Sequence, residues 1–224
     1  MNFRHEQKHI ITKSDLYTLR ARLSAVMEPD PHAIDGRYSI RSLYFDDLYD
    51  HALREKKAGT ERREKFRIRY YNLDPSLILL EKKSKFRDLT EKKQEVLTLS
   101  EAEALSKGGS FPSLETDGKP LLTELLAKIR YQTLRPMTIV DYVREPFIYA
   151  PGNVRVTLDH SIRTGLSCTD FLDPDCVMIP AGDTEAVLEV KWDGFLPSFI
   201  KDLVRVPGTR TTAFSKYEAA RIFG

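Results

Sequence analysis

Alternation of apolar side chains with mostly charged ones is the feature that most constrains how this chain can fold. It runs through the segments KFRIRY (65–70), VRVTLD (154–159) and AVLEVKW (186–192). Side chains two positions apart lie on the same face of a β-strand, whereas a helix brings residues three or four apart together. Each segment therefore predicts a strand with one apolar face and one charged face.

Further strands and a smaller number of helices are expected between these segments. The expected strands are Phe3–Thr12, Arg37–Asp46, Ser76–Lys85, Thr90–Leu99 and Pro136–Arg144. The expected helices are one capped by Ser14 that ends after Val26, then Asp50–Lys57, one opened by a capping box at Ser100–Glu103, Leu121–Ile129, Pro197–Val206 and Ala213–Phe223. Because most strands follow one another through short polar loops, we expect a β-dominated α+β fold with an antiparallel sheet.

Length and composition are those of one globular domain. The chain has 224 residues, of which 41% are hydrophobic and 30% charged, so we expect residues 1–224 to form a single domain. The apolar runs are far shorter than the roughly 18 residues that a membrane helix needs. Two cysteines form neither a disulfide framework nor a zinc site by themselves. We expect a cytoplasmic protein with reduced thiols and no membrane span.

Charge is unevenly distributed along the chain. The formal net charge is only +2, too small to indicate nucleic acid or a membrane surface, yet residues 54–95 hold 14 Lys or Arg against 8 Asp or Glu. A basic segment inside a slightly acidic chain is what an anion-binding surface needs. The alternatives are a solvated face with ordinary cross-strand salt bridges, and an RNA-binding module in which aromatic side chains stack on bases.

Acidic and basic side chains recur two positions apart on the charged faces. The pairs are Glu6 with Lys8, Glu81 with Lys83 and Glu189 with Lys191, and Arg67 with Arg69 is a doubly basic version. If the sheet curls into a barrel with helices over its apolar outer face, these pairs converge on one lumen. Guanidinium and ammonium groups bind phosphate oxygens, and a carboxylate holds the Mg²⁺ or Mn²⁺ that bridges them. The pattern favours a polyanion with a divalent metal as the ligand.

Eight short motifs follow one another in an order found in a known family. They are RHEQK (4–8), SLYFDD (42–47), KFRIRYY (65–71), LEKKSK (80–85), DYVR (141–144), VRVTLD (154–159), LEVKWD (188–193) and SKY (215–217). In this order they resemble the polyphosphate polymerase (VTC, vacuolar transporter chaperone) domain, a branch of the CYTH or triphosphate tunnel metalloenzymes. The resemblance implies a closed antiparallel β-barrel tunnel of about eight strands with helices packed outside. It also implies ATP, triphosphate or polyphosphate as ligand, with Mn²⁺ or Mg²⁺.

The resemblance further implies roles for individual residues. The positions expected to hold the transferring phosphates are Arg67, Arg69, Lys83, Arg144 and Arg155, with Lys8, Lys93, Lys191 and Lys216 as further phosphate-binding positions. Glu189 resembles the metal ligand. The family also has a tunnel lysine on the strand after Glu81 and Lys83. Alternation alone does not choose between Lys92 and Lys93 for this position, and we favour Lys93.

Polyphosphate synthesis from ATP is the activity that the resemblance favours. An acceptor phosphate is already anionic, so the transfer needs positioning and charge neutralisation rather than a general base. The broader superfamily often begins with a Glu-x-Glu-x-Lys strand, whereas Arg4 stands at the first glutamate position here, which argues against hydrolysis. A metal-dependent triphosphatase, in which Glu6 or Glu81 orients a water or metal, and a non-catalytic polyphosphate-binding module are the alternatives. The sequence holds no Gly-rich phosphate loop and no nucleophile elbow.

Overall fold

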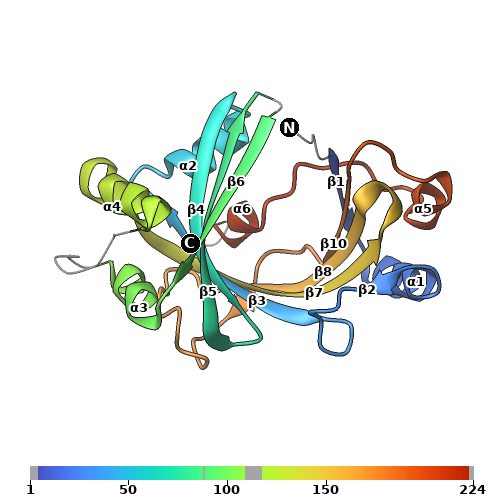
Figure 1. Ribbon diagram of the computed structural model, residues 1–224, viewed down its shortest axis with the longest axis horizontal. Helices are drawn as coiled ribbons and strands as arrows, with labels where there is room; N and C mark the ends of the chain where they lie inside the picture. Colours follow the sequence, from blue (N-terminus) through green and yellow to red (C-terminus); the bar gives the residue numbers. More distant parts are fainter. Residues whose placement is uncertain (1–4, 88, 109–117, 222–224) are drawn as a thin grey trace.

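The computed structural model describes residues 5–87, 89–108 and 118–221 (Figure 1). Phe3, where the first strand is expected to begin, Arg4 and Phe223, where the last helix is expected to end, lie outside these residues. The strands are β1 (His5–Ile11), β2 (Glu28–Pro29), β3 (Tyr38–Asp46), β4 (Arg62–Tyr71), β5 (Asp74–Phe86), β6 (Leu89–Leu97), β7 (Arg135–Tyr149), β8 (Val154–Thr164), β9 (Ile179–Pro180) and β10 (Ala186–Trp192). The helices are α1 (Lys13–Ser24), α2 (His51–Ala58), α3 (Leu99–Lys107), α4 (Pro120–Gln132), η1 (Pro151–Asn153), α5 (Ser198–Leu203) and α6 (Lys216–Ala220).

One strongly curled antiparallel sheet organises the described residues. Its strand order is β1-β10-β8-β7-β3-β4-β5-β6, and the short strands β2 and β9 pair with β7 and β8. The eight long strands are those that alternation predicts, with ends that differ by a few residues. The β-dominated α+β fold is therefore confirmed.

The predicted closed barrel is wrong, because β1 and β6 are the two edges of the sheet and do not pair with each other. The free edge of β1 is taken by another segment. His9 forms a β-bridge with Thr211, and the backbone N–H of Thr212 donates to the carbonyl oxygen of Lys8 at 2.8 Å. Residues 211–212 thus occupy the middle of the free edge of β1, and the sheet remains a half-barrel.

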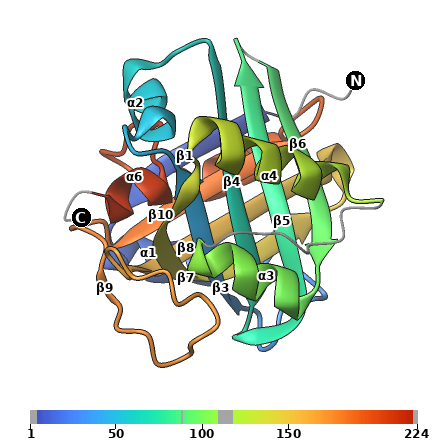
Figure 2. The same ribbon diagram turned by 90° about the vertical axis from the view of Figure 1, so that its left-hand side faces the viewer.

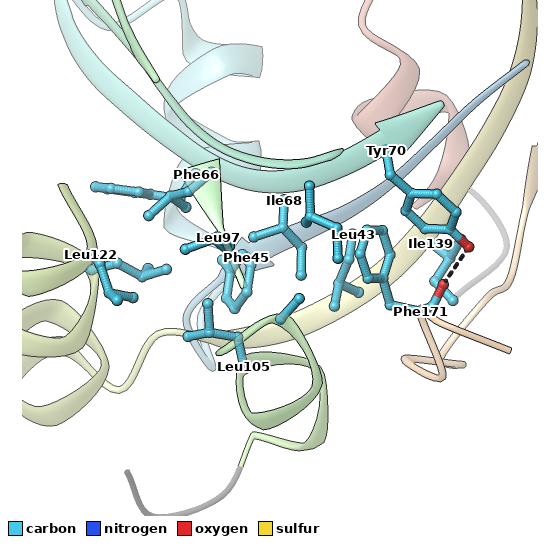
Figure 3. Close-up of a cluster of buried hydrophobic side chains, with 14 of the residues drawn as sticks. Leu43, Phe45, Phe66, Ile68, Tyr70, Leu97, Leu105, Leu122, Ile139 and Phe171 are labelled. Carbon is cyan, nitrogen blue, oxygen red and sulfur yellow. Dashed lines mark hydrogen bonds between the residues drawn. The ribbon is translucent and has the colours of Figure 1, made fainter. Parts of the chain in front are cut away.

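The convex face of the sheet carries the apolar core. Phe66 and Ile68 pack with Leu105 of α3 and Leu122 of α4 in one buried cluster, which Figure 3 shows. Val156, Leu188 and Val190 pack in a second cluster with Leu19 of α1 and Ile200 of α5. Figure 2 shows α3 and α4 lying across the β4–β5–β6 part of the sheet. The outward-facing apolar set predicted from alternation is thus confirmed.

Helix α6 lies inside the curve of the sheet instead of on its outer face (Figure 1). Its Tyr217 and Ala220 pack in a third buried cluster with Tyr44 and Tyr142. The Tyr217 hydroxyl donates to Asp46 Oδ2 at 2.8 Å. One terminal helix therefore occupies part of the concave face, which contradicts the expectation that all helices pack outside.

Helix ends depart from the expected caps by two residues. Thr12, not Ser14, caps α1, and its hydroxyl accepts from the backbone N–H of Asp15 at 3.2 Å. Thr98, not Ser100, caps α3 in a reciprocal capping box with Glu101. A threonine at the N-cap can both end the preceding strand and start the helix, because a strand residue and an N-cap residue both have an extended backbone. Among the described helices none is long and apolar enough to cross a membrane.

Candidate functional site

Strand register brings the charged side chains together on the concave face. Residues that lie opposite each other in neighbouring strands share a face. The opposed pairs on this face are Lys8 with Glu189, Glu6 with Lys191, Lys191 with Arg155, Arg144 with Asp159, Arg67 with Glu81, Lys65 with Lys83, and Lys83 with Lys92. Every sequence-predicted site residue except Lys93 therefore lies on the concave side or on α6 within it.

Glu81 is the centre of one cluster, on β5. Its carboxylate is 3% exposed and accepts from Arg67 Nε at 2.9 Å, while Arg69 and Lys92 form ion pairs with it at 2.6 and 2.7 Å. Burial opposes ionisation, but Arg67, Arg69 and Lys92 lower the pKa of Glu81 to about 2. This carboxylate is anionic at physiological pH and orients the guanidinium groups around it.

Glu189 is the centre of a second cluster, on β10. It is 4% exposed and forms ion pairs with Lys191, with Lys8 at 3.8 Å and with Arg144 at 3.9 Å. Although burial opposes ionisation, Lys8, Lys191 and Arg144 hold the pKa of Glu189 well below its usual range. The group offers a fixed negative charge in a buried, cation-rich setting.

Asp159 forms a third cluster that sequence reasoning missed. It is fully buried on β8, where it accepts two hydrogen bonds of 2.7 Å from Arg144 and an ion pair from Lys216 of α6. Lys216 is thereby tied to the sheet. The signal was present in the sequence, because Asp159 alternates on the same face as Arg155 and Thr157.

The rings of Tyr44, Tyr142 and Tyr217 lie next to the cations of the concave face. The guanidinium of Arg67 lies 5.7 Å from the centre of the Tyr44 ring, and Lys216 Nζ lies 4.4 Å from the centre of the Tyr142 ring. Tyr217 stacks on Tyr44 with ring centres 5.1 Å apart. Aromatic faces attract cations, so these rings hold the positive groups in place without neutralising them.

Lys65 lies on the same face and was overlooked as a site residue in the sequence. It is opposite Lys83 across the β4–β5 ladder, and among the described residues no carboxylate lies within ion-pair distance of it. Burial and the neighbouring charges of Lys83, Arg67 and Lys8 lower the pKa of Lys65 to about 7. The charge at this position therefore depends on whether an anion is present.

Lys92, not Lys93, lies on the charged face. Lys92 is opposite Lys83 and reaches Glu81, whereas Lys93 is opposite Lys82 and pairs with Glu91 at 3.8 Å. Lys82 points to the convex side, where it contacts Glu64 and Glu124. The register of the β5–β6 ladder therefore corrects our preference for Lys93.

Several buried polar atoms on the concave face have no hydrogen-bond partner among the described residues. They are Ser42 Oγ, Arg69 Nε, Arg155 Nε and Thr157 Oγ1. Ser42 is opposite Arg69, and Thr157 is opposite Glu189. Buried polar groups are normally satisfied, and leaving one unpaired costs about 1–3 kcal/mol. Unsatisfied donors beside paired cations are typical of a surface that receives a polar, anionic ligand.

A divalent metal fits this face only together with phosphate. Among residues 5–87, 89–108 and 118–221, no three His, Cys, Asp or Glu side chains gather into a metal site. Mg²⁺ bound with substrate phosphates needs one or two protein carboxylates, because phosphate oxygens and waters complete its shell. Glu189, with Glu6 on the adjacent strand, meets this requirement, and the unsatisfied Thr157 hydroxyl lies opposite Glu189.

Comparison with known proteins agrees with this geometry. The model of the VTC domain family matches residues 3–222. The chain belongs to the VTC domain family. No curated protein matches this VTC domain. Among solved structures, an adenylyl cyclase candidate from Hippeastrum with a dominant triphosphatase activity is 16% identical with a TM-score of 0.56, and the alignment covers 98% of this chain and 95% of that one. The PH1819 protein of Pyrococcus horikoshii is 11% identical with a TM-score of 0.50, with 96% and 97% covered. At these identities the likeness to the VTC domain is one of fold.

Proposed function

We propose that this VTC domain binds a nucleoside triphosphate or polyphosphate with Mg²⁺ or Mn²⁺ and extends polyphosphate from ATP. The observation that carries the proposal is the excess of cations on one concave face. Lys8, Lys65, Arg67, Arg69, Lys83, Lys92, Arg144, Arg155, Lys191 and Lys216 are set against Glu6, Asp30, Glu81, Asp159 and Glu189. A chain of phosphates, with a negative charge at each unit, compensates this excess along the whole face.

Arginine and lysine have different parts in this proposal. Arg67 and Arg144 are partly buried, oriented by carboxylates and backed by tyrosine rings. Their planar guanidinium groups present paired donors in fixed directions, which suits holding the reacting phosphates in line. Lys83 and Lys92 are about half exposed. These flexible point charges suit the incoming or departing part of the chain.

Phosphoryl transfer here requires neutralisation more than proton transfer. The attacking oxygen of a phosphate acceptor is already anionic, so no general base is assigned. Arg67, Arg69, Arg144 and Arg155 offset the charge that gathers on the transferring group. Glu189 is the residue that would hold a divalent metal, and a bound metal would supply further positive charge to neutralise the reacting phosphates.

Hydrolysis of triphosphate is a second candidate because of Glu6. Its carboxylate is about 30% exposed and lies on the charged face between Lys8 and Lys191, a position from which it can orient a water molecule. The Hippeastrum protein has a dominant triphosphatase activity on the same fold. A carboxylate that orients water leads to orthophosphate, whereas a bound phosphate acceptor leads to a longer chain.

Product analysis is the experiment that tests the proposed function. The purified VTC domain is incubated with ATP and Mn²⁺ or Mg²⁺, and the products are separated on a polyacrylamide gel. A growing polymer supports the proposal, and release of orthophosphate alone supports the triphosphatase. Binding without turnover in either metal supports a non-catalytic polyphosphate-binding module.

Ligand-induced stabilisation tests binding independently of turnover. Tripolyphosphate at about a hundred times its dissociation constant should stabilise the fold by about 2.7 kcal/mol, and high salt should weaken the effect. Arg67→Ala and Arg155→Ala should each reduce the thermal shift. Arg87→Ala is the matched control, because Arg87 is 70% exposed at the turn after β5. If tripolyphosphate and ATP leave the melting temperature unchanged with and without Mn²⁺, the charged face is ordinary solvated surface.

A further inference from the structure

The two cysteines of the chain meet in the segment that connects β8 and β9. Cys168 Sγ and Cys176 Sγ lie 2.7 Å apart, closer than the roughly 3.5–4.0 Å of ordinary non-bonded contacts. Both side chains are partly exposed and pack against the edge of the convex core. They are therefore accessible to a small reagent and already in contact with each other.

Local turns hold the two thiols in this position. The backbone N–H of Cys168 donates to the carbonyl oxygen of Gly165 at 2.8 Å, and that of Cys176 donates to Asp173 at 3.4 Å. The guanidinium of Arg41 on β3 donates to the carbonyl oxygen of Asp173. The segment is thus fixed to the sheet between the two cysteines, and their proximity does not depend on a free loop closing by chance.

The same segment contributes to the core through Phe171. This ring is fully buried and lies edge-on to Tyr70 with ring centres 4.8 Å apart. The Tyr70 hydroxyl donates to the carbonyl oxygen of Phe171 at 3.0 Å, as Figure 3 shows. A covalent link between residues 168 and 176 would close a loop of chain that contains Phe171, and it would hold this residue against the sheet.

We propose that Cys168 and Cys176 are a thiol–disulfide exchange site. The pair reacts with a small-molecule disulfide of the glutathione type and thereby forms a reversible internal disulfide between the two cysteines. The thiolate of Cys168 attacks one sulfur of oxidised glutathione, which breaks its S–S bond and releases one glutathione thiolate. Cys176, deprotonated by solvent, then attacks the Cys168 sulfur and releases the second glutathione. The two protein thiols are oxidised, and one glutathione disulfide is reduced to two thiols.

The environment of Cys176 favours Cys168 as the first nucleophile. Burial, together with the nearby Cys168 sulfur, raises the pKa of the Cys176 thiol to about 12. The raised pKa makes Cys176 the weaker nucleophile of the pair, because the thiolate is the reactive form. In the mixed disulfide, Cys176 is held beside the sulfur that it must attack. The proximity of the two sulfurs favours ring closure over a second glutathione adduct.

The experiment uses the full chain and its mass. The protein is treated with oxidised glutathione, quenched in acid, and examined as an intact protein and as non-reduced peptides. The expected product has lost two hydrogen atoms, contains a peptide that links residues 168 and 176, and returns to the starting mass with dithiothreitol. Glutathione adducts that persist without the internal link, or a link between two chains, overturn the proposal.

Single variants test the order of attack and the part played by the fold. Cys176→Ser should accumulate a stable glutathione adduct on Cys168, and Cys168→Ser should react more slowly at Cys176. Equal rates contradict the assigned order. In urea, the wild-type chain should give more mixed adduct and less internal link. An unchanged proportion means that the fold does not position the pair.

Stability provides a readout that does not involve the concave face. The disulfide restricts the unfolded chain, and a ring of this size should raise the melting temperature of the oxidised protein by about 5 °C over the reduced one. Cys168→Ser is the control, since it should show no difference between oxidised and reduced conditions. If the melting temperature of the wild-type protein does not rise on oxidation, the link does not hold Phe171 against the sheet.

Discussion

Glu6 on β1 and Lys83 on β5 form an ion pair of 3.7 Å across the open side of the sheet. The two strands stand near opposite ends of the strand order, and no backbone ladder joins β1 to β6. The edge of β1 is already bonded by residues 211–212. Side chains, and not backbone hydrogen bonds, therefore complete the ring of charge. An opening lined in this way can adjust to a ligand without breaking a β-ladder.

Glu189→Gln tests the carboxylate assigned to the metal. The substitution keeps the size of the side chain and removes the charge that a hard cation requires. We expect turnover with Mn²⁺ or Mg²⁺ to fall by about 100-fold or more, because the metal contributes several kcal/mol to phosphoryl transfer. Glu91→Gln on β6 is the matched control, since Glu91 is 65% exposed. An active Glu189→Gln protein with unchanged metal dependence would remove Glu189 from this role.

Lys92→Ala and Lys93→Ala form a pair that tests the register of β6. The two lysines are adjacent in sequence, yet only Lys92 contacts Glu81 on the concave face. A charge-assisted contact is worth about 1.5–3 kcal/mol, so Lys92→Ala should weaken tripolyphosphate binding by about tenfold or more. Lys93→Ala should change the affinity less than about twofold. Calorimetric titration measures both, and the reverse ranking would mean that Lys93 serves the ligand.

Lys65 predicts a pH dependence of folding stability. Its pKa falls from 10.5 to about 7 on folding, so between these values the unfolded state binds more protons and stability rises with pH. The full penalty is present below about pH 7 and has gone by about pH 10.5. Lys65→Met should therefore raise the melting temperature of the ligand-free protein at pH 6, with a gain that shrinks toward pH 10. A gain that is independent of pH would contradict the lowered pKa.

Ligand binding should take up a proton at the same residue. A polyanion next to Lys65 favours its charged form and raises its pKa above 7. At pH 8, titration of tripolyphosphate in two buffers of different ionisation enthalpy should reveal proton uptake, and Lys65→Met should reduce it. Lys83→Met is the comparison, because the pKa of Lys83 is also lowered by burial and by Lys8. Equal uptake in wild type and Lys65→Met would place the proton elsewhere.

Tyr217 predicts how firmly α6 is held inside the sheet. Tyr217→Phe removes the hydrogen bond to Asp46, and Asp46 still accepts from the backbone of α2, so the loss should be about 1 kcal/mol. Tyr217→Ala also removes the buried ring and should cost about 3–5 kcal/mol. Urea denaturation measures both against Tyr131→Phe, a control at a side chain that is 78% exposed. A Tyr217→Ala protein as stable as wild type would mean that α6 is not docked in solution.

Local patterns in the sequence were sufficient to predict the strands and to assign side chains to their two faces. The positions of Phe66 and Arg67 on opposite faces follow from a period of two, which is a property of the backbone. The same period places Glu189 and Lys191 on the face of Arg155 once the strands are paired. This is why most of the candidate site could be assembled from the sequence before any contact was known.

Long-range competition decided the features that were mispredicted. Closure of the barrel depended on which segment pairs with the free edge of β1. That segment is Thr211 and Thr212, which lie about 200 residues further along the chain. The choice between Lys92 and Lys93 depended on the register across a turn, which shifts every side chain to the other face when it slips by one residue. The place of α6 depended on a cavity that exists only after the sheet has curled.

The position of β1 has a consequence for synthesis of the protein. On one side β1 pairs with β10, and on the other it is bonded by residues 211–212. While a ribosome is still making the middle of the chain, β1 has neither partner, and the edge of β8 that later receives β10 is open. Unpaired edges of this kind attract other strands. These two edges of the nascent chain therefore stay unpaired until its last quarter has emerged.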